Sequence, residues 1–458
     1  MNKNKKTKSD NVFTFIGRTF KEGDIFTKLS FFVMGLSNLV RGQIIKGLLF
    51  LSMELGFIFY MIMAGLTAFT GLSTLGTKTQ EQIVIDKAPF IKIIKGDNSM
   101  LMLLYGVVAI FVIATFLFMW KANIKAAIEA QKLKEKGSKL PSFIDDVRAH
   151  FDAKLHRTLL FFPMMGVLVF TVLPLVFMIL IAFTNFDNTH QPPGNLFTWV
   201  GLKNFRTVLF SGQTISKTFW PVLGWTIIWA ILATGLNYIF GMLLAMLINR
   251  KGVKFKGLWR TIFVLSIAVP QFVTLLIMRN MLATEGPING MLLNAGLISK
   301  AIPFLTQATW ARVTVLIVNL WIGVPYSMLI TTGILMNIPE DIYESAKIDG
   351  ASPFIMFVKI TLPYVLFVTG PYLIQQFIGN INNFNVIYLL TTGNPSSLDY
   401  YQAGKTDLLV TWLYKLTVNR KDYSFAATIG ILVFILSATV SLIAYRRTSA
   451  YKSEEDFQ

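Results

Sequence analysis

The sequence predicts an all-α integral membrane protein with about eight transmembrane helices. Charged residues make up 14% of the 458 residues and hydrophobic residues 54%, whereas soluble domains carry about 25% charged residues. The chain also contains eight apolar runs, each near the ~20 residues that a helix needs to cross a bilayer. Because the runs are continuous rather than alternating, and backbone polar groups in lipid must pair internally, we expect helices and not barrel strands.

The Lys and Arg residues between the runs orient the chain. If the N-terminus is cytoplasmic, the inner connections hold 26 of the 42 Lys and Arg residues and the outer connections about 13. The positive-inside rule then predicts that both termini are cytoplasmic and that the protein is a multi-pass protein of the cell membrane. The runs lie near residues 44–70, 100–120, 157–184, 219–249, 261–283, 313–336, 364–390 and 423–445.

Several other function classes find no support in the composition. The excess of Lys and Arg in the inner connections accounts for most of the net charge of +18. The charge therefore does not indicate a nucleic-acid-binding surface, and we expect no nucleic acid as a partner. The chain has no cysteine, and its three histidines lack zinc-ligand spacing. The run GLSTLGTKT, residues 71–79, has the glycine spacing of a phosphate loop, but Thr77 stands where that motif needs lysine. The sequence therefore predicts a chain that is not an enzyme and binds no metal or cofactor.

We expect five segments along the chain. Residues 1–43 form a basic tail attracted to lipid headgroups, in which 29–40 is too short to span and either lies at the interface or extends the first helix. A two-helix extension, 44–120, precedes a cytoplasmic linker, 121–156, whose helix-forming start ends at Gly137 and Pro141. A six-helix core, 157–447, and a cytoplasmic tail, 448–458, complete the chain.

Acidic residues are missing from the six later runs, and Glu54, in the first run, is interpreted as facing protein or reaching toward the interface. Ion-coupled transporters generally use buried acids, so this pattern weakens a secondary-transporter hypothesis without excluding sodium sites built from carbonyls and hydroxyls. The later runs contain neutral amides instead, with Asn319 in the sixth. The seventh holds six of them: Gln375, Gln376, Asn380, Asn382, Asn383 and Asn385.

Buried amides cost free energy unless they have hydrogen-bond partners. They either bond across the bundle and hold helices together or line a polar, uncharged passage, in which aromatic side chains such as Trp321, Tyr326 and Phe384 would face a solute. We favour the passage, and a neutral hydroxylated solute fits that lining better than an ion.

The charged segment between the sixth and seventh runs predicts two short helices on the cytoplasmic side. Pro339 can start the first helix and Gly350 can end it. Ser352 and Pro353 open a second helix, which should end before Pro363. The residues alone leave open whether the pair docks onto a partner or lies on the membrane.

A longer pattern in this segment resembles the signature of permease subunits of binding-protein-dependent ABC importers. The family reads Glu-Ala-Ala, three residues, Gly, nine residues and Ile-x-Leu-Pro. This chain matches that spacing and departs only at Ser345, in place of the first alanine. The resemblance implies that the coupling loop 337–363 docks on an ATPase subunit through Glu344, Ser345, Ala346, Gly350, Ile360, Leu362 and Pro363.

Residues from about 157 to 447 also resemble the larger permease of maltose/maltodextrin importers. The matching stretches are LPLVFMILIAFTNF (173–186), AVPQF (268–272), NLWIGVPYSM (319–328), NNFNVIYLLTTGNP (382–395) and AGKTDLLV (403–410). A large extracytoplasmic domain found after the third span in that family is replaced here by about 35 residues, 185–218. The family's sugar contacts fall on Ile267, Gln271, Asn319, Ile322, Gly323, Gly379, Asn380 and Asn383, and family members can have aromatics at the first and sixth of these.

The resemblance implies a transport subunit that forms half of a pathway for a neutral oligosaccharide, most simply maltose or maltodextrin. Its partners would be a second homologous permease, two ATPase subunits that bind ATP and magnesium, an extracytoplasmic solute-binding protein and membrane lipid. An ABC permease for another sugar or for glycerol phosphate is an alternative, although the only mid-bundle cation is Arg279. A secondary transporter is the other alternative.

Overall fold

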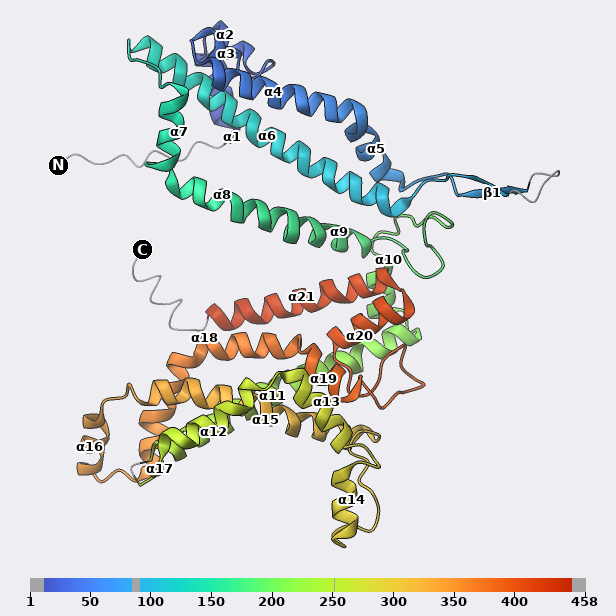
Figure 1. Ribbon diagram of the computed structural model, residues 1–458, viewed down its shortest axis with the longest axis vertical. Helices are drawn as coiled ribbons and strands as arrows, with labels where there is room; N and C mark the ends of the chain where they lie inside the picture. Colours follow the sequence, from blue (N-terminus) through green and yellow to red (C-terminus); the bar gives the residue numbers. More distant parts are fainter. Residues whose placement is uncertain (1–11, 85–90, 251, 447–458) are drawn as a thin grey trace. The chain divides into compact units, whose positions relative to one another are not determined.

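The computed structural model describes residues 12–84, 91–250 and 252–446, and the chain divides into two compact units, Met1–Trp199 and Val200–Gln458 (Figure 1). Within the described residues, seven helices are long and apolar enough to cross a membrane, and one bent pair makes an eighth span if it is counted as one. The expectation of about eight transmembrane helices is therefore confirmed. The segment boundaries expected at 43, 120, 156 and 447 stay predictions.

The first unit contains three spans. The first combines α4 (Ile44–Tyr60), the π-helical turn η1 (Met61–Gly65) and α5 (Leu66–Thr74), and the second is the single helix α6 (Ser99–Glu135). The third combines α8 (Leu155–Val167), η2 (Leu168–Val172) and α9 (Leu173–Ile181). The helix α6 continues fifteen residues beyond the apolar run that predicted it, because KANIKAAIEAQKLKE consists largely of strong helix formers. It ends close to Gly137, as predicted, and Gly137 has a positive φ of 67°.

Residues before the first span pack on the polar end of α6 and neither span nor extend the first helix. The short helices α1 (Val12–Glu22), α2 (Ile25–Leu29) and α3 (Leu36–Val40) lie there. The buried Asn123 of α6 donates to the Ser30 carbonyl and accepts from the Gly35 N–H, both at 2.8 Å. An ion pair of 2.6 Å joins Arg41 to Asp24. These bonds give the segment 29–40 a fixed place on protein, so it does not extend the first helix, and its position at the membrane interface stays a prediction.

Glu54 belongs to the same arrangement. Its Oε2 accepts a hydrogen bond of 2.8 Å from the backbone N–H of Met34, which is fully buried. The acid in the first span therefore faces protein, as one of the two interpretations held, and it satisfies a donor that no water reaches.

We expect Glu54→Leu to loosen the segment 29–40 while the spans stay folded. Leaving a buried N–H without an acceptor costs about 1–3 kcal/mol, so trypsin cleavage after the buried Arg41 should become faster. The matched control is Glu54→Gln, which keeps an acceptor oxygen and should cleave like the wild type. Equal cleavage of all three proteins would show that this bond does not hold the segment.

A short β-hairpin departs from the all-α expectation. The strands β1 (Glu81–Val84) and β2 (Ile91–Ile94) pair antiparallel, with Glu81 opposite Ile94. At the base of the hairpin, the backbone N–H groups of Lys78 and Thr77 donate to the Asp97 carboxylate. Because these bonds stabilise the charged form, the pKa of Asp97 is lower than its usual value. Gly76 of the apparent phosphate loop has φ +98°, and a Cβ there would come within 2.7 Å of the Asp97 Cβ. The turn thus accounts for this glycine.

The second unit is built around α11 (Thr214–Asn249) and α15 (Ala308–Leu335), which pack closely along their length. A Cβ at Gly241 of α11 would lie 2.8 Å from the Met328 nitrogen of α15, so glycine permits this approach. The shorter helices α10 (Lys203–Phe210) and α14 (Pro287–Asn294) and the span α21 (Tyr423–Arg446) also belong to this unit, as do α20 (Leu409–Lys415) and the π turn η4 (Leu416–Arg420).

Two spans that the sequence predicted as continuous are interrupted. The fifth consists of α12 (Lys256–Ala268) and α13 (Gln271–Met281), bent by 87° at Val269 and Pro270. The seventh consists of α18 (Leu362–Ile381) and α19 (Phe384–Thr391), separated at Asn382 and Asn383. Proline removes a helical hydrogen bond at the first interruption, and asparagine caps the following helix at the second.

The segment after α15 forms α16 (Glu340–Ile348) and α17 (Pro353–Met356), which project from the end of this unit (Figure 1). The start of α16 after Pro339 and its end before Gly350 are confirmed. The prediction that the second helix ends before Pro363 is wrong, because α17 continues through the π turn η3 (Phe357–Thr361) into α18. The π turn ends two residues before Pro363, the second residue of α18, and it marks the place where the proline cannot donate a regular helical hydrogen bond.

Candidate functional site

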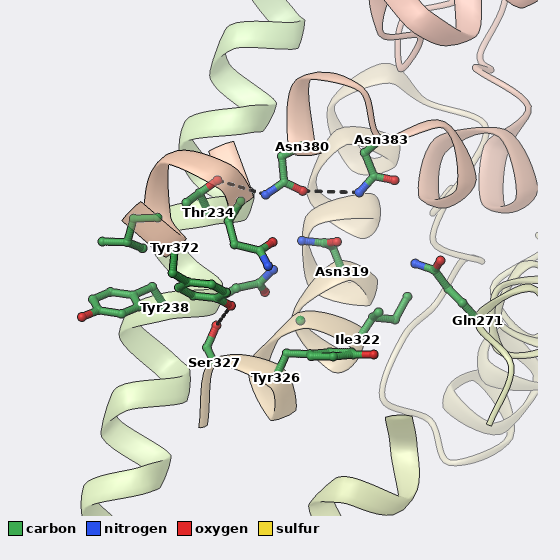
Figure 2. A pocket seen from close by; sticks show the side chains of 14 residues that line it. Thr234, Tyr238, Gln271, Asn319, Ile322, Tyr326, Ser327, Tyr372, Asn380 and Asn383 are labelled. Atoms are coloured by element: carbon green, nitrogen blue, oxygen red, sulfur yellow. Dashed lines mark hydrogen bonds between the residues drawn. The ribbon is translucent and has the colours of Figure 1, made fainter. Parts of the chain in front are cut away.

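A cavity of about 200 Å³ lies among α11, α13, α15 and the end of α18 (Figure 2). Its lining includes six of the eight positions that the resemblance assigned to sugar contacts: Gln271, Asn319, Ile322, Gly323, Asn380 and Asn383. These residues come from three spans that are separate in the sequence, and the fold brings them to one place.

The lining is polar and uncharged. Amides come from all four elements, hydroxyls come from Thr234, Ser327 and three tyrosines, and the described lining residues include no Asp, Glu, Lys, Arg or His. Amides and hydroxyls both donate and accept hydrogen bonds. Such a lining suits a neutral solute with many hydroxyl groups.

Asn380 both lines this cavity and joins two helices. Its Nδ2 donates to Thr234 Oγ1 of α11 at 3.0 Å, and its Oδ1 accepts from Asn383 Nδ2 at 3.4 Å (Figure 2). Its backbone carbonyl accepts from Trp229 Nε1 at 3.2 Å. The two interpretations of the buried amides, helix contact and passage lining, therefore apply to the same residue.

Asn383 owes its position to the interruption of the seventh span. Its Oδ1 accepts from the Val386 N–H at 3.2 Å and so caps α19. Capping leaves the Nδ2 group directed toward Asn380. The two asparagines are three residues apart and bond to each other, although the helix breaks between them.

Gln271 enters the lining because the fifth span bends. It is the first residue of α13, directly after Pro270, and its Oε1 accepts from Asn385 Nδ2 of α19 at 3.3 Å. This bond fixes the acceptor side of Gln271 and leaves its NH₂ group available to the cavity.

Two of the assigned contact positions lie outside the cavity lining. Ile267 precedes the bend, and Gly379 is exposed, with no atom within 4 Å of the place a Cβ would take. The exposed Trp321 and Arg279 also lie outside it. Sugar contacts at Ile267 and Gly379 stay predictions.

The fourth span adds lining residues that the sequence analysis missed. Thr234, Asn237, Tyr238 and Gly241 follow one another at i, i+3, i+4 and i+7, so they share one face of α11. The first three line the cavity, and the fourth is the close contact with α15. The spacing of these polar and small residues in an apolar run could have indicated a cavity-facing side of the helix. The run holds a single central asparagine, whereas the seventh run holds a cluster of amides.

The loop between α19 and α20 is held by a buried acid. The Asp407 side chain is fully buried and accepts from Gly404 N–H at 2.6 Å, Thr411 Oγ1 at 2.8 Å and Lys415 Nζ at 2.6 Å. Burial raises the pKa of Asp407, and the Lys415 ammonium opposes that rise. A Cβ at Gly393 would collide with this carboxylate, which explains the glycine in the stretch TTGNP. The acid serves the architecture of the loop.

The second candidate site is the projecting segment α16–α17. Gly350, at φ +79°, ends α16 with two reverse bonds: its N–H donates to Lys347 O at 3.0 Å, and the Ala351 N–H donates to Ala346 O at 2.9 Å. This pattern needs a residue in the left-handed conformation, which glycine adopts without cost. Tyr343 Oη and Thr361 Oγ1 lie 2.8 Å apart and tie α16 to η3.

The outer face of this segment is unusually apolar for an exposed surface. Ile348 and Phe354 are 86% and 73% exposed, while Glu344, Ser345 and Gly350 are also exposed. Ala346 and Ile360 are half-buried, Leu362 packs beside the buried Val365, and the Pro363 ring is exposed. The segment therefore offers a charged and apolar surface beyond the end of the spans.

Comparison with known proteins decides the family. Residues 237–450 match the family described as binding-protein-dependent transport system inner membrane component. The chain is 35% identical over 426 residues to the galactooligosaccharides transport system permease protein GanP of Bacillus subtilis (strain 168), covering 92% of this chain and 97% of that one. This chain belongs to that family of inner membrane transport components. It is a permease and a multi-pass protein of the plasma membrane.

Two further comparisons agree with this assignment. The permease is 35% identical over 434 residues to the maltodextrin transport system permease protein MdxF of the same organism, with 92% and 95% of the two chains covered. A crystal structure of a bacterial alginate ABC transporter, in complex with an alginate pentasaccharide-bound periplasmic protein, contains a chain with TM-score 0.53 and 23% identity. That likeness covers 67% of the permease and 97% of that chain and shows a shared fold.

Proposed function

We propose that this permease forms one half of the transmembrane pathway of an ATP-driven importer for a neutral oligosaccharide, with maltodextrins as the first candidate. The observation that carries the proposal is the cavity lined by amides and hydroxyls. Sugar hydroxyls donate and accept hydrogen bonds, and an amide side chain can accept from them through its oxygen and donate to them through its NH₂ group. The maltodextrin and galactooligosaccharide names of two relatives at 35% identity support the substrate class.

A second permease completes the pathway in this proposal. The cavity of about 200 Å³ is below the ~300–1,000 Å³ typical of ligand sites, so one chain supplies part of an oligosaccharide site. A homologous permease facing this cavity would supply the rest. An extracytoplasmic binding protein would deliver the sugar.

The segment α16–α17 is the proposed contact with the ATPase subunits. Because those subunits are cytoplasmic, the proposal puts this segment and both termini on the cytoplasmic side. Glu344 would meet basic groups on the ATPase, and the exposed Ile348 and Phe354 would be covered by it. ATP and magnesium would bind to two such subunits, and this chain would supply no catalysis. Closure of the ATPase pair would then switch the spans between inward- and outward-facing states.

The alternatives fit the cavity less well. Glycerol phosphate would require a cation near the solute, and the exposed Arg279 lies outside the described lining. A secondary transporter gives no role to the projecting segment with its signature. Another neutral oligosaccharide remains the closest competitor, since the lining chemistry is shared by all of them.

Uptake in a strain deleted for this permease tests the proposal. We expect the restored permease to support energy-dependent uptake of labelled maltotriose, with β-1,4-galactotriose as the principal competitor and glycerol phosphate as the charged control. Uptake of galactotriose alone would move the substrate assignment to galactooligosaccharides. Uptake of neither sugar, in the presence of the neighbouring transport components, would contradict the proposal.

A further inference from the structure

Asn237 of the fourth span occupies a place that only a glycine on the sixth span leaves free. If Gly323 of α15 carried a Cβ, that atom would lie 2.8 Å from Asn237 Oδ1 and still closer to the other two amide atoms. Real Cβ atoms do not approach other atoms so closely. The amide of Asn237 is therefore seated directly against the backbone of Gly323.

Two buried polar atoms of this cavity have no hydrogen-bond partner among the described residues. They are Asn237 Oδ1, an acceptor, and Asn319 Nδ2, a donor, and both residues line the cavity. The Asn319 side chain belongs to a residue that is only 4% exposed. A buried polar group without a partner costs about 1–3 kcal/mol, so such groups are rare unless a ligand satisfies them.

The neighbouring polar groups already have partners within the protein. Thr234 Oγ1 receives the Asn380 amide at 3.0 Å, Tyr238 Oη lies 2.7 Å from Thr369 Oγ1, and Ser327 Oγ lies 3.4 Å from Tyr372 Oη. Figure 2 shows the first and last of these bonds at the edge of the cavity. The unpaired acceptor and donor thus differ from these three neighbouring groups.

We propose that Asn237 binds a hydroxyl group of the transported sugar and, together with Asn319, determines which hydroxyl arrangement the permease accepts. The inference rests on the proposed function. An oxygen that accepts from a hydroxyl and an NH₂ group that donates to one match the two hydrogen-bonding roles of a sugar hydroxyl. A site that leaves a polar group unpaired when the hydroxyl is missing rejects the deoxy analogue strongly.

Gly323 has a defined part in this arrangement. A methyl group at this position would displace the end of the Asn237 side chain rather than any backbone. Gly323→Ala should therefore remove the amide from the cavity while the packing of α11 and α15 continues at Gly241. Its effect on sugar selection should equal that of removing the amide itself.

The test compares transport of an intact sugar with that of its deoxy forms. The complete importer would be supplied with maltotriose or β-1,4-galactotriose and with monodeoxy versions of each. In the wild type we expect one deoxy form to be transported about tenfold more slowly, the equivalent of one hydrogen bond of about 1.4 kcal/mol. In Asn237→Leu that preference should fall to about onefold. Because the binding protein is the same throughout, its own preference cancels from the ratio.

Controls separate this role from a structural one. A purely structural defect lowers transport of intact and deoxy sugars equally, and an unchanged preference in Asn237→Leu overturns the inference. Asn237→Ala, which only removes atoms, replaces the leucine variant if that protein fails to assemble. Asn382→Leu is the matched control, since its amide lies outside this cavity and donates to Ile378 O at 3.1 Å. Wild-type transport of neither sugar contradicts the proposed function instead.

The glycine gives an independent check. Gly323→Ala should abolish the hydroxyl preference in the wild-type background and change nothing further in Asn237→Ala, because the displaced group is then already missing. Additive losses in the double variant would mean that the two residues act separately. That result would contradict the inference that the Asn237 amide depends on the space beside Gly323.

Discussion

Replacing Gly350 by tryptophan should abolish sugar uptake, while the protein still inserts in the membrane at its normal level. This is the largest effect that we expect of a single substitution. Gly350 is in the left-handed conformation at φ +79°, which costs other residues about 1–2 kcal/mol. No atom lies within 4 Å of the place that a Cβ would take, so the indole would stand on the outer surface and block a docking partner.

The measurement is co-purification of the ATPase subunits together with uptake. Gly296→Trp is the matched control, because Gly296 also ends a helix at a positive φ, 65°, with the same two reverse bonds and open space around it. We expect that variant to keep its ATPase. Gly350→Asn separates strain from bulk, since asparagine tolerates the conformation, and should retain most activity. Normal ATPase binding by Gly350→Trp would contradict docking at this segment.

Removing both amides of the seventh span, Asn380→Ala with Asn383→Ala, should lower transport about 10- to 100-fold, from two lost hydrogen-bonding groups of up to ~1.5 kcal/mol each. The complex should still assemble. Asn383 also caps α19, which contributes about 1 kcal/mol, so Asn383→Asp keeps the cap and tests the amide alone.

Two controls decide whether these asparagines only hold helices together. Thr234→Val removes the partner that Asn380 has on α11 but leaves the amide in the cavity. If helix contact is its whole role, this variant should match Asn380→Ala. Asn382→Ala should behave as the wild type. Loss of assembly in the double variant, with transport per assembled complex unchanged, would contradict a sugar contact.

The sequence was informative where a local rule decides the structure. Apolar length predicted the spans, and Pro339 and Gly350 predicted both ends of α16, because starts and stops of helices depend on neighbouring residues. Asn380 and Asn383 were singled out by the cost of burying amides, before any fold was known. Their meeting with Gln271 and Asn319 was implied by the family resemblance.

Other features depend on residues far apart in the chain. The acceptor role of Glu54 requires a backbone N–H twenty positions earlier, and the hairpin β1–β2 is too short for an alternating pattern to identify it. The importance of Asn237 appears only when α15 places Gly323 against it, because an unpaired atom is a property of packing. The fifth span was predicted as continuous; Pro270 accounts for an interruption, but the 87° size of the bend depends on the packing around it.

The unbroken course of the chain past Pro363 has a mechanical consequence. From Pro353 to Ile381 the backbone is helical without a break, with one π turn and with Pro371 inside α18. A helix that ended before Pro363 would have absorbed a push in a loose joint. Here Phe354 lies near one end of the unbroken helical stretch and Asn380 near the other, so a displacement at the first has a continuous hydrogen-bonded path to the second.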